Sequence, residues 1–358
     1  MNGNGTPDIG VLQSDATGTP WFYVKEGKNG NLLRKVRFDA AFTPQALAMV
    51  PDLNADGADE VAVLGIDASG KVRAQVKDVK SIPAVPLGVV DFDRSYTPKY
   101  FTVVPNADGA GTTGLAVLGI NAAGDVRAQV KDLAGNPINV VHFSPAYTPK
   151  GFRAVANADG AGATGLALLG VDASGRVRVQ MKHSDPAAAT SLIRILYFDK
   201  AYSPLGFEVI PNMGGASGTP GLAVLGKNAS GIIRAQVKDV DAVSPAPVAI
   251  LTYTPSYAPQ AFRYVADMDG AGTPGLAVLG VDGTTGSVRV QARDLASTLV
   301  RKVYFNKTYA PRGFAVTGNI PIVGGGGSLA NEFAVLGEHA TKGVRVQVKD
   351  GSTGDLVA

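Results

Sequence analysis

The chain has 358 residues, a formal net charge of +3 and no cysteine, which excludes disulfide bonds and thiol nucleophiles. Its basic residues are spread along the chain instead of forming a patch, which disfavours a nucleic-acid-binding protein. No apolar run is long enough to span a membrane, and no signal peptide opens the chain. With 45 glycines and 22 prolines, the composition indicates short strands joined by turns.

One pattern, Val-Arg-x-Gln-x-Lys, returns at steps of 52, 54, 51, 56, 55 and 56 residues, counted from a divergent first copy at residues 21–26. A period of this size marks a repeat architecture. The clear copies are residues 72–77, 126–131, 177–182, 233–238, 288–293 and 344–349, with Ile233 in place of Val and Arg293 in place of Lys. We therefore expect one domain over 1–358, with repeats near 1–42, 43–96, 97–147, 148–202, 203–257, 258–309 and 310–358.

Each copy predicts four short strands. In the third copy they cover residues 101–105, 114–119, 126–131 and 138–143. The second is almost continuously apolar, as in a strand buried on both faces, whereas the third alternates apolar and polar residues. Four antiparallel strands in each of seven copies favour a β-propeller over an open β-solenoid, whose coils are usually shorter.

The two ends of the chain predict an unusual ring closure. The first strands of six copies begin near Ala46, Tyr100, Phe152, Phe207, Phe262 and Phe314. The first copy has only three strands, near residues 9–12, 21–25 and 32–38, and residues 355–358 end within or just after an outer strand. We predict an all-β, seven-bladed propeller of four-stranded antiparallel blades whose first blade lacks its innermost strand. Adjacent domains or chains would complete that blade.

The turn at residues 52–60 is the one motif with clear metal chemistry. Oxygen side chains occupy its first, third, fifth and ninth positions, and Gly57 permits a sharp turn between them. A hard cation such as Ca²⁺ takes several oxygen ligands from carboxylates and carbonyls. The candidate metal ligands are Asp52, Asn54, Asp56, the carbonyl of Ala58, and Glu60.

This turn and the strand after it resemble the repeat of the FG-GAP/VCBS family, found in bacterial surface proteins and integrin-α-like propellers. The period and the four-strand layout agree over essentially the whole chain. The resemblance implies Ca²⁺ bound between the first two strands of a blade by D-x-[DN]-x-D-G-x-x-[DE]. Only Asp52, Asn54, Asp56 and Glu60 match that pattern fully.

The corresponding turns of the other copies have lost ligands. Copy one keeps Asn2, Asn4 and Asp8 but lacks the first position. In copies three to seven we expect turns in which Asn or Asp caps its own backbone. These turns begin at Asn106, Asn157, Asn212, Asp267 and Asn319.

Three repeated or unusual features have both a structural and a functional interpretation. The Arg-x-Gln-x-Lys side chains could contact anions or sugars, but we expect a polar ladder between blades, because the third strand lies towards the outside. The aromatic residue of each Tyr-Thr-Pro corner could stack on a sugar, but we expect it to pack between blades. Trp21 either marks a contact site or covers the unfinished first blade.

Catalytic constellations are absent from the sequence pattern. His142, His183 and His339 share no repeat position, and no carboxylates group with them. A polysaccharide-degrading propeller would need a carboxylate cluster in its central channel. The innermost strands offer only Arg153, Arg263 and, at the same position, Glu208.

We therefore expect a non-enzymatic, calcium-stabilised binding module, secreted or displayed at the cell surface. It would recognise a glycan or protein ligand through loops on one face, and the family resemblance implies a role in adhesion. The alternative is a structural scaffold or spacer propeller within a larger secreted, toxin or fibre-forming protein.

Overall fold

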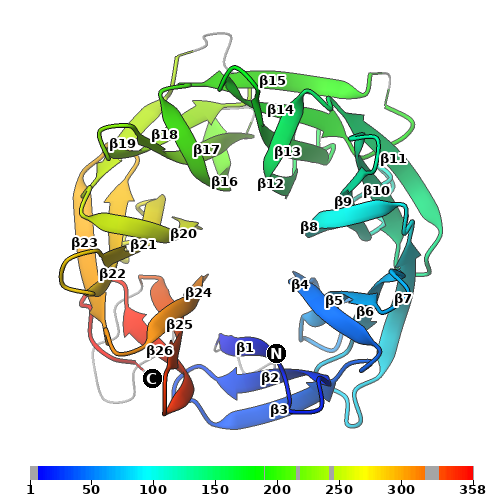
Figure 1. Ribbon diagram of the computed structural model, residues 1–358, viewed down its shortest axis with the longest axis horizontal. Helices are drawn as coiled ribbons and strands as arrows, with labels where there is room; N and C mark the ends of the chain where they lie inside the picture. The colour runs from blue at the N-terminus through cyan, green and yellow to red at the C-terminus, as the bar shows by residue number, and fades with distance from the viewer. Residues whose placement is uncertain (1–6, 189, 215–217, 242–245, 319–329, 358) are drawn as a thin grey trace.

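The computed structural model describes residues 7–357 except 189, 215–217, 242–245 and 319–329. Its strands form seven antiparallel sheets, arranged as blades around a central channel (Figure 1). This confirms the predicted all-β, seven-bladed propeller with four-stranded blades and a three-stranded first blade. No helix in the described ranges is long and apolar enough to cross a membrane.

Every blade follows one strand order from the channel outwards. The innermost strands are β4 (Phe42–Val50), β8 (Tyr96–Val104), β12 (Tyr147–Val155), β16 (Tyr202–Gly214), β20 (Tyr257–Val265) and β24 (Ala310–Thr317). The second strands are β1 (Asp8–Ser14), β5 (Glu60–Asp67), β9 (Gly114–Asn121), β13 (Gly165–Asp172), β17 (Thr219–Asn228), β21 (Gly275–Asp282) and β25 (Glu332–His339). The third strands are β2 (Pro20–Glu26), β6 (Val72–Lys77), β10 (Val126–Asp132), β14 (Val177–His183), β18 (Ile233–Asp239), β22 (Val288–Asp294) and β26 (Gly343–Asp350). The outer strands are β3 (Leu32–Arg37), β7 (Pro86–Phe92), β11 (Pro137–Phe143), β15 (Leu192–Phe198), β19 (Ala249–Tyr253) and β23 (Leu299–Phe305).

The innermost strands begin a few residues earlier than predicted, because the Tyr-Thr-Pro corner belongs to the strand instead of preceding it. Tyr96 already pairs with Asn121, and the register shifts just after Pro98. Proline cannot donate a ladder hydrogen bond, so within a sheet it is confined to edges and bulges. An innermost strand pairs on one side only, and it therefore tolerates the proline at a bulge.

The hydrophobic core consists of the joints between neighbouring blades. Phe152 of β12, for example, is buried against Val104, Leu118 and Phe143 of the preceding blade. The rings of Phe143 and Phe152 meet edge to face with centroids 6.2 Å apart. The second strands β5, β9, β13, β17 and β21 are buried on both faces because each contributes to two such joints, whereas β1 of the first blade is only partly buried.

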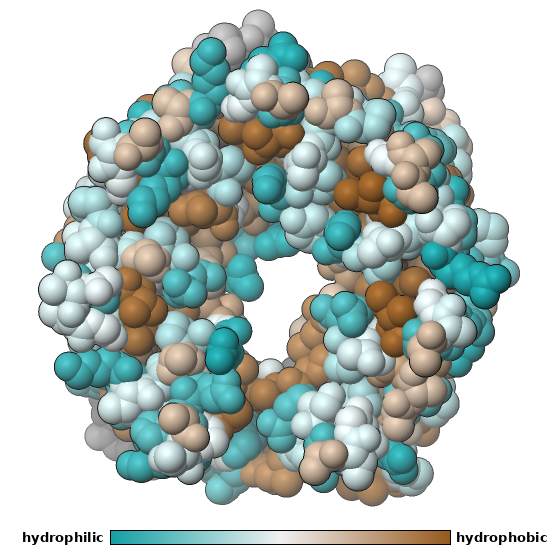
Figure 2. Space-filling view, in the orientation of Figure 1, coloured by the Kyte–Doolittle hydropathy of each residue, from teal (hydrophilic) through white to brown (hydrophobic). Residues whose placement is uncertain are grey.

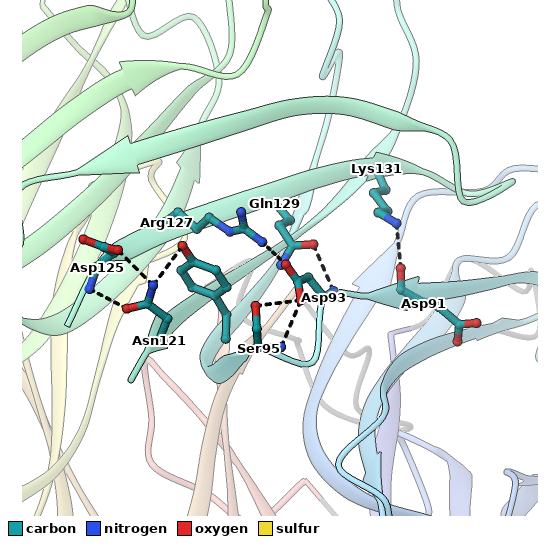
Figure 3. A network of polar contacts seen from close by, with 9 residues as sticks. Asp91, Asp93, Ser95, Asn121, Asp125, Arg127, Gln129 and Lys131 are labelled. Carbon is teal, nitrogen blue, oxygen red and sulfur yellow. Dashed lines mark hydrogen bonds and ion pairs between the residues drawn. The ribbon is translucent and has the colours of Figure 1, made fainter. Parts of the chain in front are cut away.

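Polar side chains of the third strand tie the second to seventh blades each to the preceding blade, and Figure 3 shows this contact between the second and third blades. Lys131 donates to the carbonyl of Asp91 at 2.8 Å, and the backbone N–H of Asp93 donates to Gln129 Oε1 at 3.0 Å. This contact confirms the expected polar ladder. The glutamine bond recurs at Gln75–Asp39, Gln180–Ser144, Gln236–Asp199, Gln291–Thr254 and Gln347–Asn306.

The corner aromatic residues serve the same joints. The Arg127 guanidinium lies 3.7 Å from the centroid of the Tyr96 ring and pairs with Asp93 of the crossover turn. Such a cation–π contact uses both the charge and the flat face of the guanidinium. The stack recurs at Arg178–Tyr147, Arg234–Tyr202 and Arg289–Tyr257. Packing, the expected role, therefore accounts for these tyrosines.

The ring closes at the joint between the first and last blades (Figure 1). Among the described residues, the first blade, β1-β2-β3, has no innermost strand, and the last blade, β24-β25-β26, has no full outer strand. A single bridge between Lys349 and Leu356 occupies the start of that outer position. The described strands thus leave two strand positions at this joint unfilled.

Candidate functional site

The predicted calcium loop connects β4 to β5 and is held in shape by its own side chains. Asp52 Oδ2 accepts the N–H of Gly57 at 2.7 Å, Asn54 Oδ1 accepts that of Asp56 at 3.1 Å, and Asp56 Oδ1 accepts that of Ala58 at 2.9 Å. Gly57 adopts a φ of 85°, the left-handed region in which glycine is least strained. Asp52, Asn54 and Asp56 thus lie in one compact turn and cap its backbone, and Glu60 follows as the first residue of β5.

Glu60, the fifth predicted ligand, is the unusual group of this loop. It is fully buried, its Oε2 accepts the N–H of Leu53 at 3.0 Å, and its Oε1 has no hydrogen-bond partner. Burial, together with the negative charges of Asp52 and Asp56, raises the pKa of Glu60 to about 7. A buried carboxylate oxygen without a partner fits a site for a hard cation.

The loop's side chains do not converge on one point in this conformation. In the part of the chain that the structure describes, no group of three or more His, Asp or Glu side chains is close enough to hold a metal ion. The Lys80 ammonium donates to the carbonyl of Asp56 and places a positive charge at the loop. The donor chemistry fits Ca²⁺, and binding itself stays a prediction.

In the third, fourth and sixth blades the degenerate loops are self-capped turns, as expected. In the fifth copy the expected turn at Asn212 is wrong, because strand β16 continues to Gly214 and pairs there with Thr219. In the third blade the Gly111 N–H donates to Asn106 Oδ1 at 2.6 Å, and Thr112 donates to Asp108 through both N–H and hydroxyl. The fourth-blade loop at Asn157 and the sixth-blade loop at Asp267 repeat this arrangement. Asn2 and Asn4, and the seventh-copy turn from Asn319 to Gly327, lie outside the described residues.

The channel wall holds a charged cluster that sequence analysis did not assemble. Glu208 on β16 lies between Arg153 on β12 and Arg263 on β20, the same position of three consecutive innermost strands. Arg153 Nη2 and Arg263 Nη1 each donate to Glu208 Oε1 at 3.0 Å. Oε2 takes no part in either bond. We call these three residues the channel cluster.

The channel cluster lines a hollow of ≈ 240 Å³ together with Tyr100 and Lys150. The Glu208 side chain is 14% exposed, and those of Arg153 and Arg263 are 37% and 40% exposed. Burial raises the pKa of the Tyr100 hydroxyl, and the nearby Arg153 charge opposes that rise. Figure 2 shows an open channel whose wall is hydrophilic on the side of β16 and β20.

The composition of the hollow determines what it can do. Two guanidinium groups and the Lys150 ammonium outweigh one carboxylate, so the wall attracts anions and can polarise a carbonyl oxygen. The carboxylate supplies a proton acceptor. Sequence analysis noted the three charges but missed their convergence, since they are about 55 residues apart. Their shared repeat position was the available signal.

The remaining candidates do not reach this hollow. Trp21 donates from Nε1 to Asp15 at 2.9 Å, and Lys35 lies 3.9 Å from the centroid of its ring. These contacts stay within the first blade, and both interpretations of Trp21 stay predictions. His142, His183 and His339 lie on strands of three different blades.

No family model and no curated protein matches the sequence. Solved structures do match. The chain is similar to the periplasmic gluconolactonase of Pseudomonas aeruginosa, at 13% identity and a TM-score of 0.58. The match covers 98% of this chain and 93% of the gluconolactonase. The chain is similar over 98% to 49% of a prolyl endopeptidase, at 15% identity and a TM-score of 0.53. A third match is the propeller domain of the Trilobed protease of Pyrococcus furiosus, described as an open velcro topology (98% of this chain, 90% of that chain, 9% identity, TM-score 0.51).

At these identities the comparisons show the fold alone, and they correct the functional expectation. The prediction of a non-enzymatic binding module, with a scaffold as alternative, is wrong on this finding, because similar propellers include a gluconolactonase and a prolyl endopeptidase. In place of the carboxylate cluster that a polysaccharide-degrading propeller would need, the channel wall has one carboxylate, Glu208, between two arginines. The FG-GAP/VCBS resemblance stays a prediction, since no family model matches.

Proposed function

We propose that this chain is a hydrolase of small lactones or esters that works in the central channel. The observation that carries the proposal is Glu208 held between Arg153 and Arg263 at the wall of an open hollow. The fold similarity to a gluconolactonase makes a sugar lactone the first substrate to test.

The two arginines would bind the oxygen that gains negative charge during the reaction. Each guanidinium is anchored by a second bond, from Arg153 Nη1 to the carbonyl of Phe152 at 3.0 Å and from Arg263 Nη1 to that of Phe262 at 2.8 Å. Anchored donors need little reorganisation when charge develops on the substrate, which is the basis of electrostatic catalysis. The same donors suit the carboxylate product.

Glu208 would act as the general base. In the proposed step its Oε2 takes a proton from water, and the water oxygen attacks the carbonyl carbon of the lactone. The ring C–O bond then breaks, and the ring oxygen receives the proton, so one lactone and one water give one hydroxy acid. General-base catalysis of this kind contributes about 10²–10⁴-fold to a rate.

Acid release from gluconolactone, corrected for spontaneous hydrolysis, tests the proposal directly. We expect the wild type to hydrolyse the lactone, Glu208→Gln to lose this activity, and Asp91→Asn to keep it. Asp91 is a matched control because its carboxylate also pairs with an arginine, Arg73. Asp91 lies on the outer strand β7, away from the channel. A wild type without activity on any of a panel of lactones and esters would refute the assignment.

We also propose that the loop of residues 52–60 binds Ca²⁺ and stabilises the second blade. Glu60 Oε1, buried and without a partner, supports this proposal, and Asp52, Asn54, Asp56 and the Ala58 carbonyl would supply further oxygens. Comparison of melting in Ca²⁺ and in chelator tests it. Unchanged melting would refute a stabilising site.

We infer a location outside the cytoplasm, secreted or at the cell surface, as part of the same proposal. The gluconolactonase that the chain resembles is periplasmic, and the absence of cysteine is compatible with that location. Localisation of the tagged natural protein by cell fractionation would test it.

A further inference from the structure

The joint between the first and last blades contains a groove. At the joint between the third and fourth blades, side chains occupy the corresponding space. The volume of the groove is ≈ 420 Å³, and its walls include Ile9, Val11 and Tyr23 of the first blade and Val344 and Val346 of the last. Val344 is 52% exposed. At the same repeat position in other blades, Val126, Val177 and Val288 are at most 3% exposed. We call this groove the seam.

The joint between the third and fourth blades shows what occupies the corresponding space. There Phe143 of outer strand β11 lies opposite Val126, and Phe152 of innermost strand β12 packs beside Leu166. The two rings meet edge to face. The strands that carry these phenylalanines are the two that the seam lacks, so the groove is the volume of two missing aromatic side chains and their backbone.

Chain order makes one segment sufficient for both positions. In each complete repeat the outer strand of one blade continues through the corner into the innermost strand of the next, as from β11 to β12. The chain already starts the outer position of its last blade, where the Val357 N–H donates to the carbonyl of Val348 at 2.8 Å. The remaining gap therefore matches the stretch from Val140 to Val155.

Among the described residues the chain holds no spare copy of this stretch. The outer-to-innermost pairs lie at residues 32–50, 86–104, 137–155, 192–214, 249–265 and 299–317, and each is already part of two blades. None of the described strands is therefore free to occupy the seam.

We propose that the seam binds one extended polypeptide segment, supplied from outside these residues, with two aromatic side chains spaced like Phe143 and Phe152. Its backbone would pair with β1, which is paired only with β2 among the described strands, and with β26. Main-chain hydrogen bonds to open strand edges give affinity in such strand addition, and pockets for side chains give specificity.

Gln13 adds a specificity rule. Six second strands have glycine at the position that corresponds to Gln13. In each of them the corner aromatic residue packs against that glycine and leaves no room for a side chain. A Cβ at Gly119, for example, would lie 2.8 Å from the Cβ of Tyr96. The six glycines are Gly65, Gly119, Gly170, Gly226, Gly280 and Gly337. The segment must therefore carry a small residue where the other corners carry tyrosine or phenylalanine.

A synthetic peptide with the sequence of residues 140–155 and the change Tyr147→Gly tests the proposal by titration calorimetry and by melting of the full chain. We expect saturable one-to-one binding and a higher melting temperature. A control peptide that also carries Phe143→Ser and Phe152→Ser should bind at least about tenfold more weakly, because it fills neither half of the groove. The peptide that retains Tyr147 should bind weakly to the wild type and well to Gln13→Gly.

Two results would overturn the proposal. The first is no binding of the Tyr147→Gly peptide up to about 1 mM, which would mean that the seam does not accept a strand. The second is a dimer in sedimentation without peptide that Val346→Asp converts to monomer, which would mean that a second copy covers the seam. Neither result bears on lactone hydrolysis, which is measured separately.

Discussion

Replacement of Glu208 by glutamine should have opposite effects on binding and on catalysis. Glutamine has the same size as glutamate, but it carries no charge and cannot accept the proton from water. Arg153 and Arg263, now bonded to Glu208 Oε1 at 3.0 Å, would lose their ionic partner while keeping their bonds to backbone carbonyls.

The structure sets the size of both effects. Both guanidinium groups are more than a third exposed, so each ion pair contributes only about 0.2–1 kcal/mol and stability should fall by about 1 kcal/mol. An anionic product would face two unneutralised arginines. A gain of about 1–2 kcal/mol corresponds to about 5–30-fold tighter binding. Loss of the general base should lower kcat by about 10²–10⁴-fold.

Calorimetric titration of gluconate and acid release from gluconolactone measure the two quantities on one preparation. We expect Glu208→Gln to bind gluconate more tightly than the wild type at low salt and to hydrolyse the lactone far more slowly. Weaker gluconate binding would show that the arginines do not face the ligand. Unchanged turnover would remove Glu208 from the reaction.

Three further outcomes are expected. Addition of Ca²⁺ should raise the melting temperature of the wild type but not of Glu60→Gln, as measured by calorimetry; an equal shift in both would place the ion elsewhere. Gln129→Met should cost about 1–3 kcal/mol in denaturant unfolding, because the N–H of Asp93 loses its acceptor at a part-buried joint, and a loss near zero would contradict the ladder. Hydrogen bonds from Thr17 and from Trp21 lower the pKa of Asp15 from 3.8 to about 2, so its contribution to stability is present above pH 3.8 and is lost as the pH falls towards about 2. The fluorescence of Trp21, the only tryptophan, should change as Asp15 titrates. In Asp15→Asn this pH-dependent change should disappear.

Sequence periodicity predicted the blades well because it depends on the burial pattern within single strands, and the blades share that pattern. The alternation in Val126-Arg-Ala-Gln-Val-Lys131 reflects a strand with apolar residues in a joint and polar residues toward the crossover turn. The corner was placed wrongly, because a proline suggested a turn before the strand. The innermost strand instead includes it as a bulge, which an edge strand permits.

Sites depend on differences between copies, which the repeat pattern conceals. The metal motif at Asp52 was visible because its ligands lie within one short turn. The channel cluster was not, because Arg153, Glu208 and Arg263 meet only when three blades are arranged around one axis.

By itself the sequence determined the fold class, the number of blades and the shortened first blade, because hydrophobic periodicity and turn residues act over short stretches of chain. Only the tertiary structure decided which charges meet in the channel and which joint stays open. Closure of the ring brings distant repeats together at distances that no local pattern encodes.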